Sequence, residues 1–293
     1  MELRELKYFL AVAETGSISA AAEYLYITQP SLSRQMQNLE REVGGQLFER
    51  GNRRITLTER GKLLKKRAEE MLELYGKTLA EVSAPSQEIS GEVYISGGES
   101  PAVETVIHAA MNVRKAYPAV KFRFFSGDAS AVTEKVDKGL ADFGIVIDMP
   151  DTSSYNSLRL PGGDIWGVFV KRDEELATKP YITASDMANR TIITSDQAYA
   201  RGLIAQWLGV PADKIDVAAT YNLLYVGSQL AKAGAGYVLG LEGIINTEGT
   251  DLCFKRLEPT VRTHADVIWK KYGALTRAAE YFLRELKVLC ATE

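Results

Sequence analysis

The run of residues 22–40 constrains the fold of this chain more than any other segment. It reads A-E-Y-L-Y-I-T-Q-P-S-L-S-R-Q-M-Q-N-L-E, so an alanine-rich segment, a tight turn and a helix with a polar front follow one another. This succession is typical of a helix-turn-helix, whose second helix enters the major groove of DNA. Pro30 suits the first turn of that helix, where its missing N–H costs little.

Apolar residues at helical spacing predict a helix in front of this motif, from Leu3 to Ala13, and Gly16 ends it. Ser17 and Thr28 suit the N-cap positions of the next two helices, because a hydroxyl oxygen can accept an orphan backbone N–H. The last of the three helices has one apolar side. We expect it to bury Leu32, Met36, Leu39 and Val43.

The polar side of the third helix carries side chains suited to reading DNA. Gln and Asn pair with adenine edges and Arg with guanine edges, whereas Ser, Thr and a helix N-terminus suit phosphate oxygens. A merely solvated helix face is the alternative, but the turn and the small-residue helix before it favour DNA. The predicted contacts are Ser17, Thr28, Gln29, Pro30, Ser31, Ser33, Arg34, Gln35 and Asn38.

A short hairpin is expected after the third helix. Gly51-Asn52 is a hairpin-turn signal between two short strands, and Leu47 and Phe48 should return to the core. Several arginines crowd this hairpin. We interpret it as a wing whose arginines approach the DNA backbone or minor groove, with a basic loop without a partner as the alternative. The predicted wing contacts are Arg50, Arg53 and Arg54.

One long helix is predicted from Thr58 to about Val82, with a heptad-like apolar seam. The early part of the seam can pack against the head, whereas the later part suits the same helix of a second chain. Palindromic DNA sites require two heads per molecule, so dimerisation through this helix and DNA recognition support each other. The sequence S-A-P-S at 83–86 then breaks the helix.

Beyond Ser90 the pattern alternates between strand and helix, which predicts parallel, doubly wound sheets. The last strand and helix, from residue 265 onward, are expected to return to the first unit, so that two lobes enclose a cleft. The predicted fold class is α+β multidomain. Its parts are a winged helix-turn-helix domain (1–58), a linker helix (59–88) and a two-lobed α/β effector-binding domain (89–293), with lobe one at about 89–161 and 265–293 and lobe two at about 162–264.

The motif at 22–40, the Leu-Phe-x-Arg sequence at 47–50 and the length of the chain resemble those of LysR-type transcriptional regulators. The resemblance covers the whole chain. It implies a linker helix that forms a homodimer, tetramers built from dimers, RNA polymerase as a partner and an effector domain similar to periplasmic binding proteins. The sequence departs from the family at Gly45 and Gln46, where an apolar residue and often proline stand, so a softer wing hinge is expected.

A small-molecule effector is expected beyond the carboxyl ends of the strands, where open parallel sheets bind ligands. Several helices begin there, and their N-termini favour an anionic group such as a carboxylate. Asp128 instead favours an amine or a hydroxyl, since relatives more often have an uncharged residue at this position. Ordinary helix capping is the alternative for each residue and is favoured for Asn222. By the resemblance and these helix starts, the candidate contacts are Ser100, Pro101, Asp128, Thr194, Ser195 and Asn222.

Charge is distributed unevenly along the chain. Residues 1–67 carry twelve Lys and Arg against eight Asp and Glu, whereas the remainder carries 23 against 30. A basic head on an acidic body suits a DNA-binding protein. No apolar run approaches the roughly 20 residues that cross a bilayer, and no signal-peptide core is visible. Two cysteines in a chain of 293 residues indicate a reducing compartment, so we expect a cytoplasmic protein without a membrane segment.

An enzyme and a simple solute-binding module are the rival functions. The chain lacks the common nucleophile, dinucleotide and phosphate-loop motifs, and its two histidines, His108 and His264, have no metal-ligand spacing. We therefore expect no catalytic residue, metal or cofactor, and the head argues against a solute-binding module. The sequence predicts a DNA-binding transcription regulator, in which an effector closes the cleft and changes the spacing of the DNA-binding heads.

Overall fold

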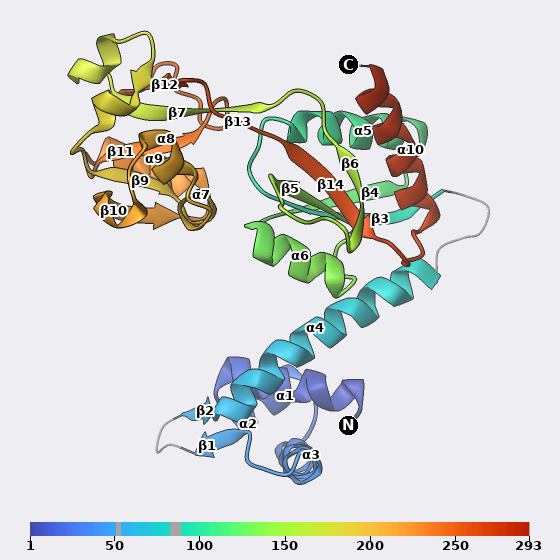
Figure 1. Cartoon of the computed structure of the whole chain (residues 1–293). Coiled ribbons are helices and arrows are strands. Elements are labelled where there is room, and N and C mark those ends of the chain that lie inside the picture. Colours follow the sequence, from blue (N-terminus) through green and yellow to red (C-terminus); the bar gives the residue numbers. More distant parts are fainter. Residues whose placement is uncertain (51–53, 83–88, 293) are drawn as a thin grey trace. The chain divides into compact units, whose positions relative to one another are not determined.

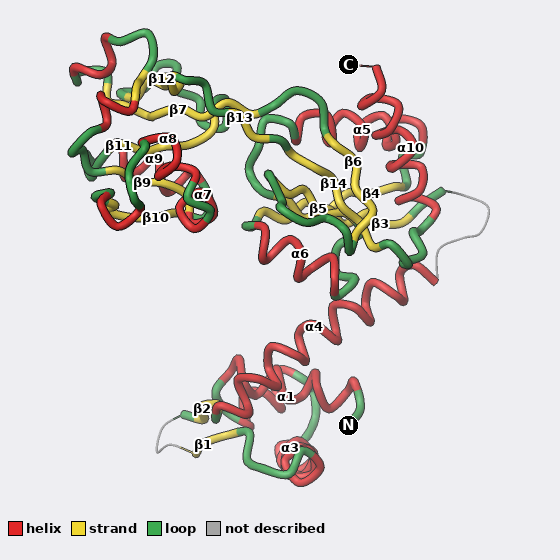
Figure 2. The backbone as a smooth tube through the Cα atoms, viewed as in Figure 1, coloured by secondary structure: helices red, strands yellow, loops and turns green. Residues whose placement is uncertain are grey.

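The computed structural model describes residues 1–50, 54–82 and 89–292, and their contacts form two compact units, Met1–Ser83 and Ala84–Glu293. Figure 1 labels the elements along the chain, and Figure 2 distinguishes helices from strands. None of the helices in the described ranges is both long and apolar enough to span a membrane.

The first unit is a three-helix head with a two-stranded wing (Figure 1). Helices α1 (Leu3–Thr15), α2 (Ile18–Tyr24) and α3 (Gln29–Glu42) precede the antiparallel strands β1 (Phe48–Arg50) and β2 (Ile55–Leu57). Gly16 ends α1 with a φ of 66°, and Ser17 Oγ caps α2 by accepting from Ala20 N at 3.4 Å, as predicted. Thr28 occupies the N-cap position of α3, but its side chain makes no capping hydrogen bond.

The core of the head forms where the apolar sides of the three helices meet. Phe9 packs against Phe48 with ring centroids 5.3 Å apart, and Glu40 Oε1 fastens the following turn by accepting from Leu47 N at 2.8 Å. Val43 is only half-buried, because it lies at the C-cap of α3 rather than on its buried side. The buried side of α3 consists of Leu32, Met36 and Leu39, as predicted.

At Gly45, where the sequence departs from the family pattern, the side chain of Arg60 packs against the backbone. Arg60 Nη1 donates to Gly44 O at 2.6 Å, and a Cβ added to Gly45 would lie 1.7 Å from that nitrogen. Glycine therefore leaves room for a contact between the start of α4 and the turn after α3.

Helix α4 (Glu59–Val82) packs against the core of the head as far as Leu72. Gly61 and Ala68 are buried, and Leu64 and Leu72 pack against the core of the head. Beyond Leu72, the large apolar side chains that the structure describes are exposed within the chain. The exposed apolar side chains of the helix are Leu63, Met71, Leu74, Tyr75, Leu79 and Val82. The helix break predicted at 83–86 lies outside the described residues.

Lobe one of the second unit is a five-stranded sheet in the order β4-β3-β5-β14-β6. Helices α5 (Val103–Ala116) and α10 (Arg277–Thr292) cover one face and α6 (Ala129–Asp137) the other, as Figures 1 and 2 show. Strand β14 and helix α10 return to this lobe, as predicted. The strands are β3 (Gly91–Gly97), β4 (Val120–Ser126), β5 (Phe143–Ile147), β6 (Tyr155–Arg159) and β14 (Ala265–Lys270).

The prediction of a parallel sheet holds for the three strands on which it was based, but not for the strand that returns to lobe one. Strands β3, β4 and β5 are parallel, but β14 is antiparallel to both β5 and β6. The reason is the chain path, because β14 re-enters lobe one from lobe two and starts at the edge where β5 ends. Strand β6, whose pattern lacks a clear apolar alternation, was missed.

Lobe two contains a mixed sheet in the order β10-β9-β11-β7-β12-β8, with β13 paired to β7. Strands β9, β10 and β11 are parallel, and β7 is antiparallel to β11 and β12, so the parallel prediction was also too simple here. The elements are β7 (Asp164–Lys171), η1 (Glu175–Thr178), β8 (Ile182–Thr183), η2 (Ala184–Met187), β9 (Ile192–Ser195), α7 (Asp196–Ala200), α8 (Leu203–Leu208), η3 (Ala212–Lys214), β10 (Val217–Tyr221), α9 (Leu224–Lys232), β11 (Tyr237–Leu241), β12 (Leu252–Glu258) and β13 (Arg262–Thr263).

Two helical segments in lobe two have bounds that periodicity alone does not show. The segment that ends at Leu208 is divided into α7 and α8 by Gly202, which has a φ of 68°. Helix α9 begins only at Leu224, because Tyr221 is the last residue of β10.

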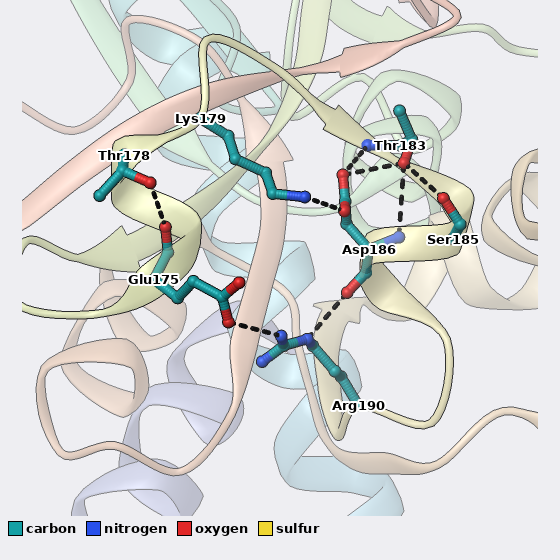
Figure 3. A network of polar contacts seen from close by, with 7 residues as sticks. All are labelled: Glu175, Thr178, Lys179, Thr183, Ser185, Asp186 and Arg190. Carbon is teal, nitrogen blue, oxygen red and sulfur yellow. Dashed lines mark hydrogen bonds and ion pairs between the residues drawn. The ribbon is translucent and has the colours of Figure 1, made fainter.

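A polar network fastens the segment between η1 and η2 in lobe two (Figure 3). Asp186 accepts from Thr183 N at 2.9 Å and forms an ion pair with Lys179, and Arg190 Nε donates to Asp186 O at 2.8 Å. The hydrogen bond from Lys179, followed by the bonds from Thr183, lowers the pKa of Asp186 to about 2. The ionised carboxylate therefore contributes to holding this segment together.

The lowered pKa of Asp186 predicts a pH dependence. Its contribution to stability is complete above the ordinary value of 3.8 and is lost as the pH falls toward 2. We expect Lys179→Met to raise the pKa toward 3.8, measured by NMR titration of the carboxyl carbon. Lys214→Met, in η3 of the same lobe, is the control and should leave the titration unchanged. An unaltered pKa in Lys179→Met would exclude Lys179 as the main cause.

Two glycines of α4 provide a matched test of its packing. A Cβ on Gly61 would lie 2.1 Å from Leu47 O, whereas one on Gly76 would meet no atom within 4 Å. We expect Gly61→Ala to destabilise the head by about 1–3 kcal/mol, as overpacking does. Gly76→Ala should be neutral or stabilising by up to about 1 kcal/mol, because alanine favours a helix.

Hydrogen exchange of the head amides in the full chain measures both effects. Tryptophan fluorescence supplies an internal control, because all three tryptophans (Trp166, Trp207 and Trp269) lie in the second unit. Equal protection of the head in the two variants would contradict the close contact between α4 and the head.

Candidate functional site

The polar side of α3 lies on the surface of the head. Gln29, Pro30, Ser31, Arg34 and Asn38 are exposed. Ser33 and Gln35 are half-buried beside them. Since the Thr28 side chain makes no capping bond, the first-turn amides of α3 are not satisfied by it and can face an external acceptor. The arrangement combines base-pairing side chains with a helix N-terminus suited to phosphate.

Ser17 and Arg54 belong to segments that meet at the base of the wing. Ile55 N donates to Gly16 O at 2.9 Å, and Arg54 passes so close that a Cβ on Gly16 would lie 2.4 Å from its Nε. Gly16 thus provides both a positive φ and the space for Arg54, whose side chain is exposed. Of the other wing predictions, Arg53 and the side chain of Arg50 lie outside the described residues.

The second unit contains a pocket of about 110 Å³ between its two lobes. Its walls come from the carboxyl ends of β3, β4 and β5 in lobe one and of β9, β10 and β11 in lobe two, where ligands bind in open parallel sheets. The lining residues are Gly98, Glu99, Gly127, Ile147, Asp148, Trp166, Ser195, Gln197, Ala198, Arg201, Leu203, Tyr221, Asn222, Leu224, Leu241, Ile244 and Thr263.

Two of the predicted effector contacts line this pocket. Ser195 is the N-cap of α7 and accepts from Ala198 N at 3.2 Å, which leaves its hydroxyl hydrogen available to a ligand. Asn222 lies between β10 and α9, and its Oδ1 accepts from Leu223 N at 2.9 Å, which leaves its amide nitrogen as a donor.

Ser100 does not line the pocket, because its side chain is buried against the strand that crosses into lobe two. Ser100 Oγ donates to Asp164 Oδ2 at 2.6 Å and accepts from Ala102 N at 3.0 Å. Burial raises the pKa of Asp164, and the hydrogen bond from Ser100 opposes that rise. In this arrangement Ser100 anchors the crossover between the lobes.

Three other predicted contacts also lie away from the pocket wall. Thr194 is fully buried in β9, and within the described residues its hydroxyl has no hydrogen-bond partner. Asp128 caps α6 by accepting from Ala131 N at 2.8 Å. Pro101 is exposed and borders a separate polar depression beside Gly162 and Gly163.

Two charged residues that the sequence analysis missed connect the lobes across the pocket. Glu99 Oε2, in lobe one, accepts from Leu224 N at 2.5 Å. Arg201 Nη1, in lobe two, donates to Ile147 O at 2.8 Å and to Asp148 O at 2.9 Å. The sequence signal for Glu99 was a charged residue two positions after the end of β3. Arg201 had no such signal, because its position depends on the break between α7 and α8.

The described residues contain no group of three or more His, Cys, Asp or Glu side chains able to hold a metal ion. Cys253 and Cys290 are half-buried. The polar groups that line the pocket can offer a ligand hydrogen bonds and charge.

Models of known protein families match the chain in two separate segments, and the boundary between its two compact units, after Ser83, lies between these segments. Residues 3–62 match the model of bacterial regulatory helix-turn-helix proteins of the lysR family. Residues 86–291 match the model of the LysR substrate binding domain. The second match alone covers more than half of the chain.

Curated relatives and solved structures give the same result. YfeR of Shigella flexneri, an uncharacterized HTH-type transcriptional regulator, is 26% identical over 283 residues, which are 95% of this chain and 91% of the relative. TfdT of Cupriavidus pinatubonensis, an HTH-type transcriptional regulator, is 35% identical over 59% of this chain and 78% of its own.

The fold is similar to that of CbnR, a LysR family transcriptional regulator, with a TM-score of 0.79, 20% identity and 99% of each chain covered. CbnR in complex with its target DNA gives a TM-score of 0.78 at 21% identity, over 99% of this chain and all of CbnR. The chain belongs to the LysR family: it is a DNA-binding transcription regulator controlled by a small molecule, and not an enzyme.

Proposed function

We propose that the exposed polar side of α3 reads the operator, with Arg34 as its main base-reading residue. The observation that carries this proposal is the burial of Leu32, Met36 and Leu39 on the opposite side, which orients the polar side outward. An arginine can bond to both acceptors on the major-groove edge of guanine. Beside it, Gln29, Gln35 and Asn38 would read adenine, whereas Pro30, Ser31 and Ser33 would pack against the DNA.

Contacts to the DNA backbone complete the proposed interface. Ser17, Thr28 and Arg54, together with Arg50 and Arg53 of the wing, would position α3 by contacting phosphates or the minor groove. The proximity of Ser17 to Arg54 around Gly16 supports this assignment, because one phosphate could receive both groups.

We infer that two chains associate through the second half of α4. Its exposed apolar residues include Met71, Tyr75 and Val82, which recur at intervals of four and seven and so lie on one side of a helix. Solvent exposure of such a stripe is unfavourable, and a second α4 would cover it. Family membership favours tetramers of such dimers, a cytoplasmic location and interaction with RNA polymerase.

For the effector, we propose a small monocarboxylate that also carries an amine or a hydroxyl. The pocket wall is largely apolar, but it includes the guanidinium of Arg201 and the carboxylates of Glu99 and Asp148. Arg201 would attract a carboxylate, whereas the two acidic residues would accept from a donor and repel a second negative charge. Ser195 and Asn222 add donors to the same wall.

Control would operate through the bonds that join the lobes. Glu99 and Arg201 each bond to the backbone of the opposite lobe, so a ligand that meets these groups alters the balance between lobe arrangements. The ligand shifts that balance only by the difference between its affinities for the two arrangements.

Substitution of Arg34 tests the proposed reading of DNA by α3. Arg34→Ala should weaken binding to DNA selected by the wild-type protein from a random pool, by about 1–3 kcal/mol, and relax specificity at one base position. The measurement is a titration by fluorescence anisotropy at fixed salt concentration. Arg41→Ala changes the charge equally at the other end of α3 and should preserve the specificity ratio. If Arg34→Ala also retained the specificity ratio, Arg34 would not be the base-reading residue.

Substitution of Arg201 tests the proposed effector pocket. A thermal-shift series of short monocarboxylates, hydroxy acids, amino acids and dicarboxylates should stabilise the protein, because a ligand of the folded state raises its melting temperature. We expect monoanions with a donor group to give the largest shift and Arg201→Met to abolish it. Arg172→Met is the matched control. Like Arg201, Arg172 donates to two backbone carbonyls, but these carbonyls belong to its own lobe, and Arg172 lies outside the pocket wall. Equal shifts in both variants would refute the role of Arg201.

A further inference from the structure

Tyr26, in the turn between α2 and α3, has an unusual backbone conformation. Its φ is 54°, in the left-handed region that favours glycine. Among the described residues, the other non-glycine residues with positive φ are Asp148 and Asn189, which are residue types that adopt this conformation readily. A tyrosine has no such local compensation, so this backbone conformation is unfavourable for it.

The fold gains little from the Tyr26 ring in return. The residue is 96% exposed, so its side chain is not packed against the head. Its backbone bond, from Tyr26 N to Glu23 O at 3.1 Å, would form equally with glycine. The same holds for the neighbouring bond from Ile27 N to Ala22 O at 3.0 Å. A benefit from this ring must therefore come from a contact outside the chain.

The position of Tyr26 indicates what that contact is. It lies two residues before Thr28, at the end of α3 that carries the exposed residues Gln29, Pro30 and Ser31. When the N-terminal part of a recognition helix enters the major groove, the turn before it lies beside a DNA backbone. Tyrosine hydroxyls are among the groups that donate to phosphate oxygens and fix the register of a protein on the duplex.

We propose that Tyr26 is a DNA-backbone contact, whose phenol donates to a phosphate oxygen at the groove edge and positions α3. The proposal rests on the DNA recognition by α3 proposed above. Glycine at this position would give a more stable head with weaker DNA binding, so the tyrosine trades stability for binding.

Tyr26→Gly and Tyr26→Phe in the full-length protein separate the two roles. Tyr26→Gly should increase hydrogen-exchange protection of the head and lower the affinity for DNA about three- to ten-fold, as expected for one hydrogen bond. The affinity should fall equally for the selected site and for a scrambled duplex, because a phosphate contact carries no sequence information. Tyr26→Phe should reproduce the loss of affinity without the gain in protection.

Two further variants serve as controls. Tyr272→Phe alters a tyrosine that is 99% exposed in the second unit and should leave DNA binding unchanged. Arg54→Ala should reduce the slope of log affinity against log salt concentration by about one, whereas Tyr26→Gly should not change it, since a neutral phenol releases no counterions.

Wild-type affinity in Tyr26→Gly would overturn the proposal, as would a loss confined to the selected site. Reduced protection of the head would refute the strain argument. Normal DNA binding with lost promoter activation would assign Tyr26 to a protein partner instead. If Arg34→Ala weakens binding and Tyr26→Gly does not, only the role of Tyr26 fails; if neither does, recognition by α3 fails.

Discussion

The head depends on one packing constraint, the burial of the apolar side of α3. Leu32, Met36 and Leu39 are at most 2% exposed, so the rotation of the helix about its own axis is fixed. Successive residues of a helix are about 100° apart, and even a one-residue rotation would turn the polar side away from DNA. The orientation of Arg34 therefore follows from the same contacts that stabilise the head.

Glycines determine how closely the neighbouring segments approach this core. Gly61 allows α4 to contact the backbone of Leu47, and Gly16 makes room for Arg54 at the base of the wing. Both contacts join parts of the head that are distant in sequence. At Tyr26 the backbone conformation favours glycine, but the sequence has a tyrosine whose ring is exposed. With Tyr26 as the proposed DNA-backbone contact, stability and DNA binding would place different demands on the same small domain.

In the second unit, the path of the chain determines the pocket. Strand β14 returns from lobe two and runs antiparallel to β5. The carboxyl ends of the parallel strands of both lobes line the same pocket. Glu99 and Arg201 then bond across it to the opposite lobe. As proposed above, a ligand in this pocket would be surrounded by the groups that join the lobes, which would couple its binding to their arrangement.

The sequence by itself determined the helix-turn-helix, the Gly16 and Ser17 boundaries and the long α4, because these follow from local periodicity and capping. Only the tertiary structure decided the mixed sheets, the break at Gly202 and the burial of Ser100 against Asp164. Sequence pattern identified the strand ends at which the pocket forms. It could not show which side chains face the pocket, because that depends on contacts between residues far apart in the chain.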